Sequence, residues 1–133
     1  MNGDGKAQEV FKTLDRIIVR INYVARKRIE NPIFEIWFHS ADGTRFAQHS
    51  TDWDHFSCQA IDGKGYIDFV VNSLPLVPGR YSVGISITAS DKVTRYHWQP
   101  KRYWITVNSA NFGNGLVFLP HEWVEMSRPN DHK

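Results

Sequence analysis

Residues 80–88 constrain the fold more than any other stretch, because their side chains alternate strictly. Pro78 and Gly79 come directly before them and mark a turn, since Pro fixes φ and Gly accepts a left-handed backbone. Bulky apolar residues then occupy every second position, which is typical of a half-buried β-strand. The bulky set is Tyr81, Val83, Ile85 and Ile87, and the small or polar set is Arg80, Ser82, Gly84, Ser86 and Thr88.

Similar alternation recurs along the chain in short stretches bounded by turn residues. No sustained apolar pattern with a period of 3.6 residues accompanies it. We therefore predict an all-β fold, an antiparallel β-sandwich with the strand of residues 80–88 at its centre. The other predicted strands cover residues 16–24, 33–39, 66–73, a segment from 95 that is broken at Pro100, 103–108 and 116–120.

Three segments lack a clear period. Residues 45–64 are predicted to form a long irregular connection, which in a compact domain is more often functional than accidental. Residues 1–13 begin as turn material, and residues 127–133 are predicted to be disordered. With 133 residues, the chain is expected to form a single domain spanning 1–133, with an ordered core of about 10–123.

Composition and charge exclude several classes of protein. The formal net charge is only +2, and the one dense basic cluster, residues 26–28, is interpreted as a strand end or, preferably, a solvated loop, so no nucleic-acid partner is predicted. No apolar run approaches the roughly 20 residues that span a bilayer, and no N-terminal signal sequence is predicted. Cys58 is the only cysteine, which excludes an intrachain disulfide and suits a reducing compartment.

One polar cluster, formed by His49, Asp52, Asp54 and His55, has the residue types of a metal site. The two aspartates lack the further oxygen ligands and the spacing of a calcium loop. Zinc would need three or four nitrogen or sulfur ligands, which Cys58 could complete only by a coincidence of folding. We predict a polar loop, with no metal and no cofactor.

Catalytic motifs are not found in the sequence. Neither a phosphate-binding loop nor a Gly-x-Ser-x-Gly elbow is present, and Cys58 near His55 is more readily structural than catalytic. Glu35 and Asp68 could be neighbouring carboxylates, but nothing marks either as perturbed in the way that glycoside hydrolysis requires. The chain is therefore predicted not to be an enzyme.

Aromatic residues make up 14% of the chain, and several occupy outward positions on the predicted strands. Flat aromatic rings bind the apolar faces of sugars, while planar polar groups bind the hydroxyl rim. The small residues of the central strand, Ser86 among them, could form the floor of a shallow groove between aromatic walls. The predicted carbohydrate-binding residues are Trp37, His39, Tyr66, Asp68, Asn72, Ser86 and Trp104 on strands, with Trp53, Tyr96, His97 and Trp98 in a second group.

Several segments, in order, resemble one known family. They are ARKRIENPIFEIWFHSADG at 25–43, LPLVPGRYSVGISI at 74–87, YHW at 96–98 followed by YWITV, and GNGLVFLPHEW at 113–123. Together they resemble the C-terminal domain of Wzt, the nucleotide-binding subunit of ABC exporters for lipopolysaccharide O-antigen. The resemblance implies a jelly-roll or immunoglobulin-like β-sandwich without catalytic residues, and the ATPase domain of such subunits is absent from this sequence.

The resemblance also implies a function and partners. The domain is expected to bind O-antigen polysaccharide for export across the inner membrane, as part of lipopolysaccharide biosynthesis. Expected partners are the transporter's ATPase domain, its membrane subunit and a second copy of the domain in a homodimer. The location implied is cytoplasmic, peripheral to the inner membrane. The alternative is a protein-interaction or dimerisation module whose exposed aromatics bind no glycan.

Overall fold

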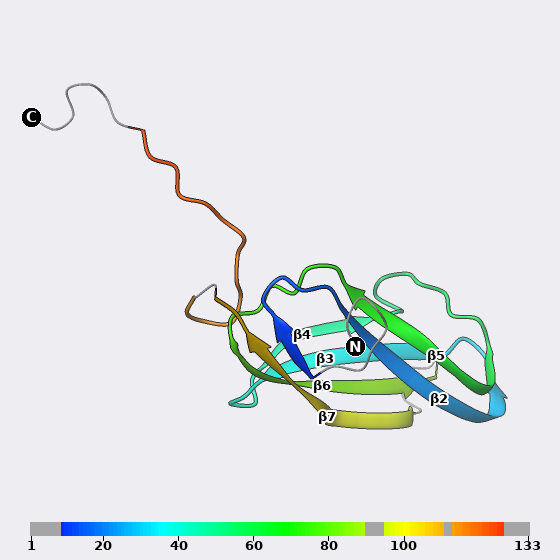
Figure 1. The fold of residues 1–133 in the computed structure, drawn as a ribbon. Helices are drawn as coiled ribbons and strands as arrows, with labels where there is room; N and C mark the ends of the chain where they lie inside the picture. The colour runs from blue at the N-terminus through cyan, green and yellow to red at the C-terminus, as the bar shows by residue number, and fades with distance from the viewer. Residues whose placement is uncertain (1–8, 90–94, 111–112, 127–133) are drawn as a thin grey trace, which may run out of the picture.

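The computed structural model describes residues 9–89, 95–110 and 113–126, and only the backbone of residues 95–102. Its strands form two sheets that pack face to face, which confirms the predicted all-β sandwich (Figure 1). The larger sheet has the order β1-β7-β6-β3-β4, and the smaller sheet pairs β2 with β5. The strands are β1 (Val10–Lys12), β2 (Ile17–Ile29), β3 (Ile33–Ser40), β4 (Arg45–Ser50), β5 (Ile61–Val71), β6 (Gly79–Thr88) and β7 (Arg95–Asn108).

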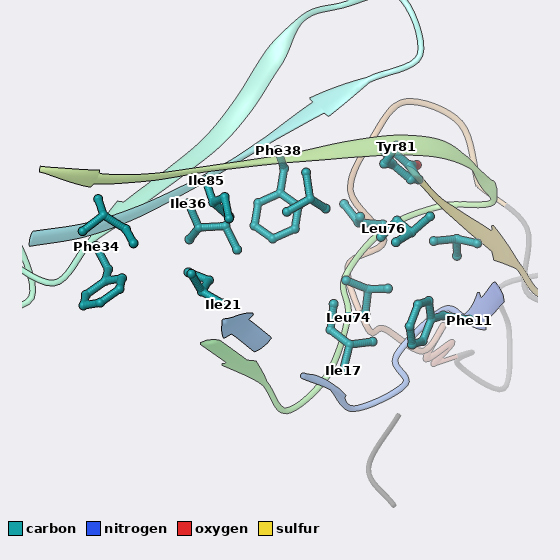
Figure 2. Packing of buried hydrophobic residues seen from close by; sticks show 14 of the residues in the cluster. Phe11, Ile17, Ile21, Phe34, Ile36, Phe38, Leu74, Leu76, Tyr81 and Ile85 are labelled. Carbon is teal, nitrogen blue, oxygen red and sulfur yellow. The ribbon is translucent and has the colours of Figure 1, made fainter. Parts of the chain in front are cut away.

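The core lies between the two sheets and is built from the alternating strand faces. β6 sits between β7 and β3, and its bulky set is at most 5% exposed, as the alternation predicts. Phe34, Ile36 and Phe38 of β3 point to the same layer, where Ile17 and Ile21 of β2 meet them from the smaller sheet (Figure 2). This packing fixes which side chains of each strand face outward.

The prediction of an irregular connection at residues 45–64 is wrong for the first and last residues of that range. Residues 45–50 form the edge strand β4, and residues 61–64 already belong to β5. The register between β3 and β4 shifts at Phe38/His39, so Phe46 is the extra residue of a bulge. Phe46 and Ala47 both pack against the core, which breaks the period of two. Only residues 51–60 connect the strands.

β7 differs from the predicted pair of strands. It runs continuously through Pro100, and the predicted break survives as a register shift, since Val83 pairs with Tyr103 but Ile85 pairs with Gln99. At the N-terminal side, β1 pairs in parallel with β7, with Val10 opposite Thr106. A strand of three residues is too short to show a period, so the sequence assigned it to turn material.

The predicted strand at 116–120 does not form. Only one bridge links it to the body, Leu76 with Val117, flanked by backbone bonds from Val77 N to Leu116 O and from Phe118 N to Pro75 O. In this register Pro75 lacks the N–H that would donate to Phe118 O, so the ladder cannot extend on that side. Beyond this bridge the chain leaves the sandwich as an extended arm (Figure 1).

The basic residues 26–28 belong to the exposed end of β2, so the strand-end alternative is correct and the preferred loop is wrong; a register shift follows Ala25. Among the described residues there is no helix of the length and apolarity that a membrane crossing requires. The predicted disordered tail, 127–133, lies outside the described residues.

Candidate functional site

The outer face of the five-stranded sheet gathers four of the predicted residues. His39 of β3 lies opposite Ser82 of β6, and Ser82 lies opposite Trp104 of β7. One row along, Trp37 lies opposite Gly84. Directly opposed residues share a face of a sheet, so adjacent strands bring these groups together. We call this surface the tryptophan face: Trp37, His39, Arg45, Arg80, Ser82, Gly84, Ser86 and Trp104.

The floor of the tryptophan face is buried rather than open. Ser82 is 0% exposed and Ser86 is 2% exposed, so the small residues do not line the solvent-accessible groove that the sequence suggested. Trp37 and His39 are also buried. Among the described residues, the Ser82 hydroxyl has no hydrogen-bond partner. A buried hydroxyl without a partner is unfavourable, and a polar ligand group that reached it would remove that cost.

Two arginines stack on the tryptophans of this face. The guanidinium carbon of Arg80 lies 4.7 Å from the centre of the Trp104 ring, and that of Arg45 lies 5.5 Å from the Trp37 ring. Both distances are within the range of cation–π attraction. Both arginines and Trp104 are exposed, so they form the accessible upper layer of the face above the buried floor.

Tyr66, Asp68 and Asn72 lie elsewhere, on the outer side of the β2–β5 pair. Arg20 lies opposite Asp68 and bonds it through two nitrogens, at 2.8 and 3.0 Å, while its guanidinium stacks 3.9 Å from the ring centre of Tyr66. The hydrogen bond from Arg20 lowers the pKa of Asp68. Arg16 donates to Asn72 at 3.4 Å. We call Arg20, Tyr66 and Asp68 the tyrosine face; it points away from the tryptophan face.

The second predicted group is only partly described. Trp53 lies in the turn of residues 51–55 and is 57% exposed. Tyr96, His97 and Trp98 belong to β7, where His97 pairs with Ile87 and Trp98 pairs with Ser86, but their side chains lie outside the described residues. A shared surface of these four residues therefore stays a prediction.

The two carboxylates considered for hydrolysis line one small cavity. Glu35, His49, Asp54 and Asp68 contribute to its wall, and its volume is about 60 Å³. That is far below the roughly 300–1,000 Å³ of small-molecule sites. A general acid needs a raised pKa, whereas the pKa of Asp68 is lowered. The geometry therefore offers no carboxylate pair poised for glycoside hydrolysis.

The polar loop gives no catalytic or metal-binding arrangement either. Burial raises the pKa of Cys58, which disfavours the thiolate that a nucleophile requires. His49 stacks on Phe69, with ring centres 5.6 Å apart. Within residues 9–89, 95–110 and 113–126, no three His, Cys, Asp or Glu side chains come together as a metal site would require.

The arginines are the site residues that the sequence interpretation left out. Arg20 and Arg80 occupy outward positions of their alternating strands, so the same pattern that selected Tyr66 and Trp104 could have selected them. Arg45 directly follows the Asp-Gly turn. The bulge comes next to it, so alternation along residues 45–50 does not show which face of the sheet Arg45 occupies. Trp123, on the extended arm, is 93% exposed and was also not singled out.

Comparison with known proteins agrees with the resemblance found in the sequence. The family model of the Wzt C-terminal domain matches residues 1–119, nearly the whole chain. A solved structure described as the crystal structure of the C-terminal domain of Wzt superimposes with a TM-score of 0.83; the match covers 95% of this chain and 79% of that chain, at 10% sequence identity. At that identity the superposition shows a shared fold. No curated protein sequence matches. The chain belongs to the family of Wzt C-terminal domains.

Proposed function

We propose that this chain is a non-catalytic carbohydrate-binding domain that recognises O-antigen polysaccharide for export by an ABC transporter. Membership of the Wzt C-terminal domain family supports a role in such a transporter. The proposal places the domain on the cytoplasmic side of the inner membrane, attached through the transporter's ATPase domain and membrane subunit. Recognition, rather than bond cleavage, is the activity.

The observation that carries glycan binding is the combination of exposed Trp104 with polar groups on one face. Trp104 is 40% exposed, and an indole surface of this kind stacks on the C–H face of a sugar ring. Arg80 and Arg45 supply hydrogen-bond donors for the hydroxyl rim, and the unpartnered Ser82 hydroxyl lies in the buried floor, on the same strand as Arg80. Sugar rings would contact the upper layer of the tryptophan face first.

Each such site is expected to be weak, because a shallow face buries little of a sugar. Affinities between about 1 μM and 1 mM are typical of such modest contacts. A homodimer would raise the effective affinity for a repeating polymer, since the second site binds the same chain. Pairing of two copies is therefore part of the proposal.

The extended arm supports that pairing and also favours a second candidate function, a protein-interaction module without glycan binding. Leu119, Trp123, Val124 and Met126 are between 71% and 93% exposed, and the arm runs away from the sandwich (Figure 1). Apolar side chains gathered on an extended segment are suited to a protein partner. In the first candidate function, the arm contacts the second copy of the glycan-binding domain. In the second, binding a protein partner through the arm is the only function.

Two matched variants test the proposal. Trp104→Ala should weaken binding of the O-polysaccharide of the encoding bacterium about tenfold or more, because aromatic platforms contribute most of such an interface. Tyr66→Ala removes an aromatic that is even more exposed than Trp104, from the tyrosine face, and should leave affinity unchanged. Calorimetric titration measures both. A loss only in the Tyr66 variant would place the site on the other face, and no binding by the folded, unmodified chain would favour the interaction module.

A further inference from the structure

The described arginines differ in the groups that they contact. Arg20 and Arg28 form salt bridges, at 2.8 Å to Asp68 and at 2.6 Å to Glu30. Arg45 and Arg80 instead stack on Trp37 and Trp104, and neither has a carboxylate within 4 Å among the described residues. The two arginines that lie over a tryptophan and form no ion pair among the described residues are therefore both on the tryptophan face.

Their positions on the sheet place them on either side of the buried floor. Arg45 lies opposite His39, which lies opposite Ser82, so Arg45 and Ser82 are two strand spacings apart, or about 10 Å. Arg80 is two residues before Ser82 on β6 and shares its face. A ligand that crossed the strands above Ser82 would therefore meet both guanidinium groups.

Both arginines are exposed, so the N–H groups of each guanidinium are accessible to a ligand. A guanidinium that lies over an aromatic ring keeps its N–H groups directed sideways, and this planar fork matches the two oxygens of a carboxylate. Arg45 uses one nitrogen to donate to Gln48 Oε1, at 2.9 Å, and Arg80 has no recorded hydrogen bond among the described residues. The nearest acid in the register, Glu35, lies two positions before Trp37 on β3 and accepts a hydrogen bond from Gln48 at 3.4 Å.

We propose that the polysaccharide recognised by this face is acidic, with a carboxylate-bearing sugar such as a uronic acid bound by Arg80 and Arg45. This inference rests on the proposed function and narrows its substrate class. Trp104 binds a ring face, and each of the two arginines binds a carboxylate. A neutral polymer could pack its sugar rings on the exposed aromatic surface, but it would leave the two guanidinium groups without an anionic partner.

Matched polymers test the inference. Bacterial O-polysaccharides rich in uronic acids are titrated against the 133-residue chain, each in its native form and after carboxyl reduction, which converts each uronic acid into the neutral hexose. Charge-assisted hydrogen bonds predict at least about tenfold tighter binding of the native form, with a preference that shrinks as salt rises. Equal affinity for the two forms would overturn the inference and leave the proposed function standing. Binding of neither form would overturn both.

Arginine variants locate the effect. Arg80→Gln and Arg45→Gln should each reduce the preference for the native polymer, while the affinity for the reduced polymer changes less. Arg26→Gln removes a cation from exposed β2 and should keep the full preference, because that residue lies in the smaller sheet. Circular dichroism checks that each variant is folded. A preference that survives in both tryptophan-face variants, or that disappears in Arg26→Gln, would contradict the assignment.

Discussion

At Tyr81, one buried hydrogen bond closes the turn that starts the central strand. Its phenol oxygen donates to Val77 O at 2.6 Å, across Pro78 and Gly79. A Cβ on Gly79 would lie 3.3 Å from that oxygen, so the close approach of ring and turn favours glycine there. Burial raises the pKa of Tyr81, in keeping with a phenol that stays protonated and donates.

Tyr81→Phe removes this bond while keeping the ring. The variant should lose about 1–3 kcal/mol of unfolding free energy, because the Val77 carbonyl is left in the interior without its donor. Urea denaturation measures the change. Tyr23→Phe is the matched control, since Tyr23 is a half-buried tyrosine with no recorded hydrogen bond among the described residues; it should change stability little. Equal effects in the two variants would contradict the role given to the Tyr81 bond.

Asp42, in the turn between β3 and β4, is expected to titrate unusually low. Hydrogen bonds from the Ser40 hydroxyl and from Thr44 N hold the ionised form and lower its pKa from 3.8 to about 2. Because the folded-state pKa is depressed, the turn's contribution to stability is present above about pH 4 and is lost as the pH falls towards 2.

NMR titration of the Asp42 carboxyl group measures this pKa directly, and Ser40→Ala should move it up towards 3.8. A value near 3.8 in the unmodified chain would show that these hydrogen bonds do not hold the carboxylate.

At the scale of single elements, the strands could be predicted where their side chains alternate regularly between the two faces of the sheet. β3 and β6 follow their alternation from end to end. β4 escaped because the bulge at Phe46 places two successive side chains in the core. The segment 116–120 looked like a strand because its own residues suit one, whereas an obstacle lies in Pro75 of the partner segment. The residues of one segment do not show which hydrogen-bond donors its partner segment lacks.

The arm is the element whose role is most directly tested by deletion. A chain that ends after Phe118 keeps both backbone bonds to the body but loses the exposed apolar side chains of the arm. It should stay folded and be monomeric, whereas the full chain should form a dimer. Light scattering coupled to size-exclusion chromatography gives the two masses. A truncated chain that remains dimeric would place the dimer interface on the sandwich itself.

At the scale of the whole molecule, the sequence separated inward from outward positions but not one sheet from the other. Trp104 and Tyr66 both alternate outward, yet β7 and β5 belong to opposite layers, and only long-range pairing decides this. The predicted site residues therefore divide between the tryptophan face and the tyrosine face. Burial of Trp37 and Ser82 was equally beyond local pattern, because it depends on what packs across neighbouring strands.

The central claim is that polysaccharide binds on the tryptophan face. Backbone amide chemical shifts, recorded as the O-polysaccharide of the encoding bacterium is added to the 15.4 kDa chain, report the contact surface residue by residue. The largest shifts are expected on β3, β6 and β7 around Trp37, Ser82 and Trp104, while β2 and β5 change little. Shifts concentrated around Tyr66 and Asp68, or none at saturating polysaccharide, would contradict it.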